Sequence, residues 1–158
     1  MAGFGADPLG TVDASGLSLG IVAARWHADI TDSMVSRAEA AAKACGVAVV
    51  DVRRVAGSVE LPIVAQALAE QHDAVIAFGV ILRGETGHYG AVCDSVNMGL
   101  TRVALDTSTP VGHGVLMVND IDQARNRAGL PGSAEDKGWS YTVAVLDAAL
   151  TLRDLRSP

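Results

Sequence analysis

The chain contains few aromatic residues and no excess of positive charge. Phenylalanine, tryptophan and tyrosine make up 4% of its 158 residues, whereas hydrophobic residues make up 49% and glycine contributes 17 residues. A core of alanine, valine and leucine is therefore expected, which fits an α/β protein better than a sandwich or a barrel. The net charge is −6, so the chain lacks a basic surface for the phosphate backbone of nucleic acid. We expect no nucleic-acid partner.

Long apolar runs and metal-ligand spacings are also missing. No apolar run reaches the length that spans a bilayer, and the first residues, MAGFGADPLGTVDASG, lack the charged and apolar regions of a signal peptide. We therefore expect a cytoplasmic protein without membrane contact. Cys45 and Cys93 lie on the predicted apolar faces of two helices, which indicates buried, reduced thiols. The four histidines do not have the spacing of metal ligands, so no metal is predicted.

Apolar runs alternate with helix-period patterns along the chain. With 158 residues, the chain is long enough for one domain and too short for two ordinary ones. Buried strands are predicted at residues 17–24, 47–55, 73–82 and 111–118. Helices are predicted at residues 29–46, 59–71, 88–103 and 121–128, with one more after the loop GLPGSAEDKG. The order βαβαβαβαα predicts an α/β three-layer sandwich, a four-stranded parallel sheet with helices on both faces.

Local signals predict the ends of two helices. Asp29 or Thr31 can cap the first helix, and Ser133 and Asp136 form an S-x-x-D capping box for the last one. The last helix is expected to bury Trp139, Val143, Leu146 and Leu150.

Two groups of residues are expected outside the core. Residues 1–15 are small and not periodic, so we expect an arm whose order depends on other contacts, ahead of a single domain at residues 16–158. The polar residues expected at the surface are Arg25, His27, His72 and Asp73.

The segment AFGVILRGETGHYG, from Ala77 to Gly90, predicts a strand, a glycine-rich turn and the start of a helix. Backbone N–H groups at such a turn are unpaired and lie at the positive end of the helix dipole, which suits an anion such as phosphate. Thr86 adds a hydroxyl donor, and His88, in the first helical turn, is of the residue type that titrates near neutral pH. Taken alone, the turn also fits an ordinary α/β connection, because glycine is common at sharp turns.

Residues suited to ligand binding also follow the other strands. Trp26 follows the first strand, Gly57 to Glu60 follow the second, and His113 lies near the fourth. Because ligands of such sheets bind outside the carboxyl ends of the strands, we expect these residues to share one site with the turn around Thr86. Trp26 offers a flat face for a heteroaromatic ring, and Glu60 accepts hydrogen bonds from hydroxyl or amide groups. Simpler roles stay open, since Trp26 can close the core and Glu60 can complement a helix dipole.

Several motifs in this order match one known family. The chain resembles the 6,7-dimethyl-8-ribityllumazine synthase family from Leu17 to Leu155. The resemblance rests on Trp26, on GSVELP in place of the family's G-A/S-x-E-x-P, and on GVILRGETGHY in place of its G-x-V-I-R-G-x-T-x-H-F/Y. RAG followed by DKG, near the end of the chain, completes the match. The resemblance implies a flavodoxin-like fold.

The resemblance also implies an activity and an assembly. The implied reaction condenses 5-amino-6-(D-ribitylamino)uracil with 3,4-dihydroxy-2-butanone 4-phosphate to 6,7-dimethyl-8-ribityllumazine, a transferase step of riboflavin biosynthesis that needs no cofactor or metal. The implied assembly is a homo-oligomer with sites between subunits, in which the N-terminal arm adds to a neighbour's sheet. The loop before the last helix lacks the short G-x-K-x-G-N form associated with capsid-forming members. A pentamer is therefore expected.

The resemblance assigns a role to each matching residue. His88 would move protons, and Arg127 would join the phosphate site from a neighbouring subunit. The same neighbour would supply Lys137 and the backbone near His113. The residues implied in substrate binding are Trp26 for the pyrimidine ring, Ser58, Val59 and Glu60 for the ribityl chain and ring edge, Val80, Ile81 and Leu82 for the ring pocket, Gly84, Glu85 and Thr86 for the phosphate, and His113.

Some positions depart from the pattern of the family. Gly87, Gly90 and Ala91 stand where the family usually has other residues, and His113 occupies a place that often carries phenylalanine or asparagine. We expect the fold and the phosphate site to follow the family more closely than the choice of substrate does.

Three other functions are weighed against the enzyme. A flavin- or lumazine-binding protein without turnover would keep Trp26 but would not need His88, and a shell-forming protein would have a structural role. The joint presence of Thr86, His88, Arg127 and Lys137 favours the enzyme. A flavodoxin-like nucleotide binder should have a phosphate loop after the first strand, where this chain has ARWHAD.

Overall fold

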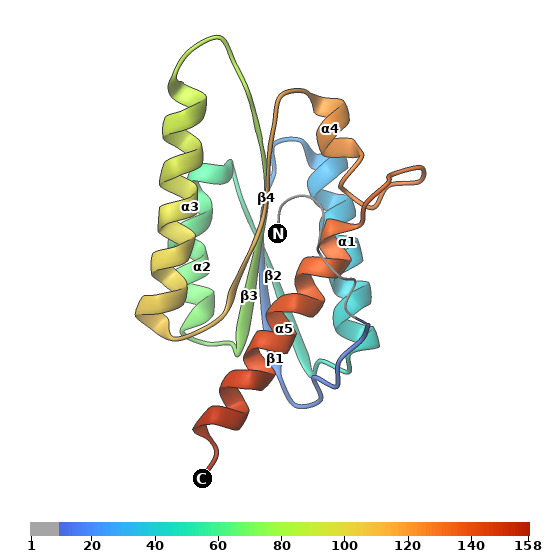
Figure 1. Ribbon diagram of the computed structural model, residues 1–158, viewed down its shortest axis with the longest axis vertical. Helices are drawn as coiled ribbons and strands as arrows, with labels where there is room; N and C mark the ends of the chain where they lie inside the picture. Colours follow the sequence, from blue (N-terminus) through green and yellow to red (C-terminus); the bar gives the residue numbers. More distant parts are fainter. Residues whose placement is uncertain (1–9) are drawn as a thin grey trace.

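A computed structural model describes residues 10–158 as a parallel sheet between two layers of helices (Figure 1). The strands are β1 (Ser18–Ala24), β2 (Val49–Val55), β3 (Ala74–Leu82) and β4 (Val111–Val118). They lie in the order β2-β1-β3-β4, and every neighbouring pair is parallel. The helices are α1 (Ala28–Ala44), the 3₁₀ helix η1 (Ser58–Glu60), α2 (Leu61–Ala69), α3 (His88–Thr107), α4 (Ile121–Arg125) and α5 (Lys137–Arg156). The predicted three-layer α/β architecture is confirmed.

Each face of the sheet has its own hydrophobic core. Helices α1, α4 and α5 cover one face, and α2 and α3 cover the other (Figure 1). The central strand β3 serves both cores, with Phe78 buried beneath α1 and α5 and Ala77 buried beneath α2 and α3. A strand that is buried on both faces needs a continuous apolar run, which explains the sequence AVIAFGVIL of β3. Cys45 and Cys93 are buried free thiols, as predicted.

The capping predictions for α1 were wrong. This helix begins after His27, whose backbone is left-handed with φ 60° and ψ 50°, and no side chain caps it. Thr31 is drawn inward instead, because its hydroxyl donates to the carbonyl of Ala24 at 2.8 Å.

The capping prediction for α5 was half right. Asp136 is the N-cap, and its carboxylate accepts a hydrogen bond from the N–H of Trp139 at 3.2 Å. Ser133 takes no part in this cap, because its hydroxyl is used within the preceding loop, where it accepts from the N–H of Leu130 at 3.0 Å. The buried residues Val143 and Leu146 and the partly buried Trp139 and Leu150 form the inner face of the helix, as predicted.

The start of α5 lies tightly against α1. A Cβ at Gly138 would meet the carbonyl oxygen of Met34 at 2.5 Å, so only glycine allows this crossing. Arg37 of α1 reinforces it, since its Nε lies 2.8 Å from a carboxylate oxygen of Asp136 and its guanidinium lies 5.1 Å from the ring centroid of Trp139. These contacts determine where the neighbouring Lys137 lies.

Among the first described residues, Val12 and Ala14 pack against the core of their own subunit. Ala14 is fully buried and its N–H donates to the carbonyl of Cys45 at 2.7 Å. The rest of the predicted arm, residues 1–9, lies outside the described residues. Within residues 10–158, no helix is both long and apolar enough to cross a membrane.

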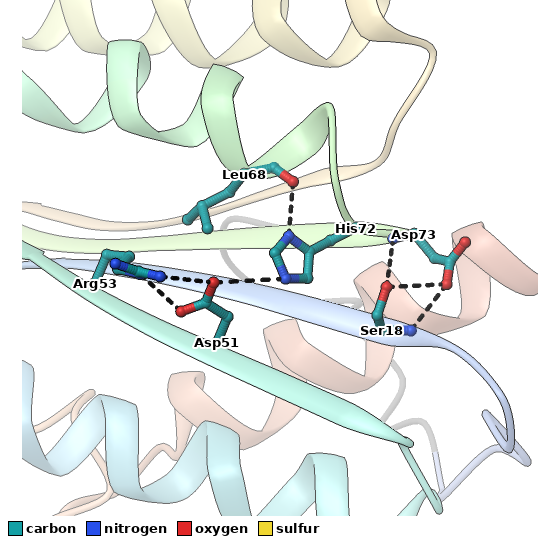
Figure 2. Close-up of polar contacts among 6 residues, drawn as sticks. All are labelled: Ser18, Asp51, Arg53, Leu68, His72 and Asp73. Carbon is teal, nitrogen blue, oxygen red and sulfur yellow. Dashed lines mark hydrogen bonds and ion pairs between the residues drawn. The ribbon is translucent and has the colours of Figure 1, made fainter.

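The side chain of His72 is largely buried, so its predicted surface position was wrong. Its side chain is only 7% exposed, and its Nε2 lies 3.8 Å from a carboxylate oxygen of Asp51. Its Nδ1 lies 2.8 Å from the carbonyl oxygen of Leu68 (Figure 2). Gly20 makes the room for this packing, because a Cβ there would meet the Cβ of Leu68 at 3.0 Å and Nδ1 of His72 at 3.4 Å. The hydrogen bond from Arg53 lowers the pKa of Asp51 and so keeps a carboxylate beside the imidazole.

Asp73 is exposed, as predicted, but it joins two segments. Its carboxylate accepts hydrogen bonds from the N–H of Ser18 at 2.8 Å and from the hydroxyl of Ser18 at 3.2 Å (Figure 2). These bonds connect the start of β1 to the turn before β3.

We expect His72→Ala to lower the free energy of unfolding by about 1–3 kcal/mol, because it removes a partly buried hydrogen bond and opens space above Gly20. Urea unfolding followed by circular dichroism measures this loss. Gln71→Ala, at the exposed neighbouring position, is the matched control and should change stability by less than about 0.5 kcal/mol. Equal losses in both variants would contradict the structural role of the imidazole.

Candidate active site

The loops after β1 and β2 begin side by side at the carboxyl edge of the sheet. The parallel hydrogen-bond ladder continues past the strands, because the N–H of Arg25 donates to the carbonyl of Val55 at 2.7 Å and that of Trp26 to Ala56 at 3.1 Å. Trp26 is nevertheless 66% exposed. The simpler role of closing the core is therefore excluded, and the indole is accessible to a ligand.

The indole of Trp26 rests on the backbone of Gly57. A Cβ at Gly57 would lie 2.4 Å from Cζ3 and 2.5 Å from Cε3 of the ring. The N–H of Gly57 donates in turn to Oε2 of Glu60 at 3.0 Å. Glu60 thus supports the start of η1, and it remains exposed.

Ser58 and Val59 face in different directions. Val59 is 54% exposed, whereas Ser58 is 7% exposed and its hydroxyl oxygen is buried without a hydrogen-bond partner. This hydroxyl lies against Gly79 of β3, where a Cβ would meet it at 2.4 Å. In this conformation the hydroxyl of Ser58 is not accessible to a ligand.

The end of β3 contributes mainly to the cores. Val80 and Ile81 are 8% and 7% exposed, and they point into opposite cores because neighbouring residues of a strand face opposite sides. Leu82 is partly buried on the same side as Val80. These residues form the apolar end of β3, directly before the next loop.

The loop between β3 and α3 is open to solvent. Gly84, Glu85, Thr86 and His88 are all exposed. The helix α3 starts at His88, and the N–H of His88 donates to the hydroxyl oxygen of Thr86 at 3.3 Å, which leaves the hydroxyl hydrogen available to a ligand. The first turn of this long helix presents N–H groups at the positive end of its dipole. The predicted phosphate site is thus accessible.

Arg83, which was expected at this edge without a role of its own, supports the loop. Its Nε donates to the amide oxygen of Asn119 at 2.8 Å, and its guanidinium lies 4.4 Å from the ring centroid of Tyr89. The N–H of Arg83 donates to the carbonyl of Val118 at 2.9 Å. The start of the loop is thereby tied to the end of β4. The signal in the sequence for a role of Arg83 was its position directly after a buried strand.

Arg127 and Lys137 are joined by a backbone hydrogen bond. The N–H of Lys137 donates to the carbonyl of Arg127 at 3.0 Å, and Nη1 of Arg127 donates to the carbonyl of Gln123 at 2.8 Å. The segment from α4 to α5 that carries both residues covers the face of the sheet opposite to α3 (Figure 1).

The ammonium group of Lys137 is held in place by its neighbours. Its Nζ lies 2.8 Å from Oε2 of Glu135 and 5.2 Å from the ring centroid of Tyr141. Burial lowers the pKa of Lys137, but the hydrogen bond to Glu135 and the interaction with Tyr141 outweigh it, so that the pKa is raised. Lys137 therefore carries a positive charge at neutral pH.

His113 does not lie at the carboxyl end of β4, where it was expected. It pairs with Ala77 in the register of the sheet, whereas the last residue of β4, Val118, pairs with Leu82. It lines a cavity of about 270 Å³ between β4 and α5, together with Tyr141. Burial lowers the pKa of His113. The prediction failed because it placed the residue by its nearness to a strand in sequence, without the register.

No group of three or more histidine, cysteine, aspartate or glutamate side chains within residues 10–158 is arranged to hold a metal ion. The site is built instead from an exposed indole, backbone N–H groups, hydroxyl and carboxylate acceptors and an exposed imidazole. These features define the class of protein: a flavodoxin-like α/β fold with exposed polar residues at the carboxyl ends of parallel strands, where such folds bind ligands.

The family follows from comparison with known proteins. A family profile described as 6,7-dimethyl-8-ribityllumazine synthase matches residues 16–153. The chain belongs to this family, and the predicted resemblance is confirmed.

Relatives that carry this name match nearly the whole chain. The chain is similar to the 6,7-dimethyl-8-ribityllumazine synthase of Salinispora arenicola, with 67% identity over 98% of this chain and 93% of the relative. The proteins of the same name from Thermobifida fusca and Mycobacteroides abscessus are 58% and 56% identical, over 92% and 100% of this chain and 86% and 99% of the relatives.

Proposed function

We propose that the chain catalyses the condensation of 5-amino-6-(D-ribitylamino)uracil with 3,4-dihydroxy-2-butanone 4-phosphate to 6,7-dimethyl-8-ribityllumazine. This is a transferase reaction of riboflavin biosynthesis, and it releases phosphate and water. One observation carries the proposal: the exposed Trp26 and the open loop from Gly84 to His88 stand at adjacent parts of one sheet edge, in a chain that is 67% identical to a relative named for this product.

The chemistry explains the choice of residue types. The primary amine of the uracil attacks the ketone to give an imine, phosphate leaves by β-elimination, and ring closure follows. His88 moves protons between these steps. The backbone of Gly84 to Thr86 binds the phosphate, Trp26 stacks on the pyrimidine ring, and Val59 and Glu60 contact its edge. Much of the acceleration comes from holding the two reactants in register.

We further propose a homopentamer whose sites lie between subunits. Arg127 and Lys137 are joined by a backbone hydrogen bond and belong to the segment from α4 to α5, on the face of the sheet opposite to α3; following the family resemblance, a neighbouring copy would supply both residues to the loop at His88. Exposed apolar side chains support contact with other copies, among them Val49, Val50, Ile63 and Met98. The arm at residues 1–15, the domain at residues 16–158 and the cytoplasmic location stay predictions.

A binding protein without turnover is the second candidate function. It would use the same indole and the same phosphate loop, but it would not need His88 at the first turn of α3. The accessibility of His88 beside the hydroxyl of Thr86 favours the enzyme.

The purified chain should form the lumazine from the two substrates without added metal or cofactor. The product is followed by its absorbance and fluorescence, against the slow uncatalysed reaction measured without protein. A rate equal to that background would favour the binding protein.

Two substitutions separate proton transfer from phosphate binding. We expect His88→Ala to lower kcat about 10²-fold without abolishing turnover, because the reactants are still held together.

Arg127→Ala should raise the KM of the phosphate substrate about 10- to 100-fold, through the loss of a charge-assisted hydrogen bond. Arg125→Ala, at the last residue of α4 and paired with Asp29, is the control and should leave this KM unchanged. An unchanged KM in Arg127→Ala would refute the role of Arg127.

Light scattering of the purified protein tests the assembly. We expect a mass of about five times the 16.2 kDa of the chain. A megadalton species would show a closed shell, and a monomer would refute sites shared between subunits.

A further inference from the structure

Gly57 makes an unusually close contact with the indole of Trp26. The three heavy atoms nearest to a Cβ built on Gly57 are all atoms of this ring, at 2.4, 2.5 and 3.3 Å. Carbon atoms of a side chain do not approach an aromatic ring to the shorter of these distances without displacing it. The observed place of the indole therefore requires a residue without a side chain at position 57.

The backbone itself does not require glycine at this position. Gly57 has φ −135° and ψ −177°, an extended conformation that any residue adopts. Its role is thus different from that of Gly46 or Gly129, whose positive φ values of 77° and 69° favour glycine for conformational reasons. At Gly57, the three nearest atoms that a side chain would disturb all belong to the indole.

The backbone on both sides of this contact is held by hydrogen bonds. Trp26 donates its N–H to the carbonyl of Ala56 at 3.1 Å, and Gly57 donates its N–H to Oε2 of Glu60 at 3.0 Å. The left-handed residue His27 then turns the chain into α1. Neither segment can easily move away to make room for a methyl group, so the indole, which is 66% exposed, is the part that would move.

We propose that Gly57 is a positioning residue, which sets the orientation of Trp26 by letting the six-membered ring of the indole lie against its backbone. A ring that is held in one orientation keeps its exposed part in place for a planar ligand, which lowers the cost of ordering the side chain on binding. This role rests on the proposed function, in which the ligand is the pyrimidine substrate.

The first test reads the orientation of the indole and does not depend on catalysis. The chain has two tryptophans, so Trp139→Phe leaves Trp26 as the single reporter. In that background, Gly57→Ala should lower the fluorescence anisotropy that reports restricted ring motion and increase quenching by acrylamide. Gly90→Ala is the matched control, because a Cβ at Gly90 meets nothing within 4 Å. Unchanged anisotropy and quenching in Gly57→Ala would overturn the proposal.

The second test reads the effect on the substrate, in the otherwise unaltered chain. Gly57→Ala should raise the KM of the pyrimidine substrate about 5- to 10-fold, as expected when stacking is weakened, and should leave the KM of the phosphate substrate within about twofold. A purely structural defect would affect both substrates or would lower the amount of folded protein. Equal changes in the two KM values would therefore count against positioning.

A double substitution shows whether the effect passes through the indole. In a Trp26→Ala background, Gly57→Ala should add less than about twofold to the KM of the pyrimidine substrate, because no ring remains to be displaced. Additive effects would overturn the proposal. If the chain lacks turnover altogether, the proposed function fails, while the anisotropy measurement still decides whether Gly57 positions the indole.

Discussion

The hydrogen-bond ladder of the parallel sheet is the interaction on which the rest of the structure depends. It continues beyond the strands, where Arg25 donates to Val55 at 2.7 Å and Arg83 donates to Val118 at 2.9 Å. Because all four strands run in one direction, the loops after them start at the same edge. The indole of Trp26 and the first turn of α3 are therefore positioned by backbone bonds in the sheet, and the loops themselves need few contacts with one another.

Side chains that the hydrogen-bond ladder does not position are positioned by close packing at glycine residues. Gly138 lets α5 start against the backbone of Met34, which determines the position of Lys137, and Gly57 lets an aromatic ring lie on the chain. In both cases the lack of a side chain allows a short distance between the glycine and the group packed against it. The backbone conformation of Gly57 itself is ordinary. The molecule thus presents two groups of polar residues: the exposed loop from Gly84 to His88 at the edge of the sheet, and Arg127 with Lys137 on the face opposite to α3. This arrangement supports the proposal of a site shared between copies of the chain.

Most of the fold was predictable from the sequence, and the exceptions share a cause. The continuous apolar run of β3 and the apolar stripe of α1 identify these elements, because burial imposes a period on the residues themselves. The capping of α1 was not predictable, since Asp29 and Thr31 both fit the local signal and the fold uses a left-handed His27 without a side-chain cap. The sequence predicted His72 at the surface, because no local pattern shows that Gly20, which is distant in sequence, makes room for the imidazole.

The sequence by itself determined the order and type of the elements, the family, and the residue types available at the carboxyl edge, because these depend on local periodicity and on the spacing of motifs. Only the tertiary structure decided which way each side chain points. It turned the hydroxyl of Ser58 inward against Gly79, exposed the indole of Trp26, and placed His113 away from the carboxyl end of β4. The physical reason is that orientation follows from register and from contacts between residues distant in the chain, which no local pattern contains.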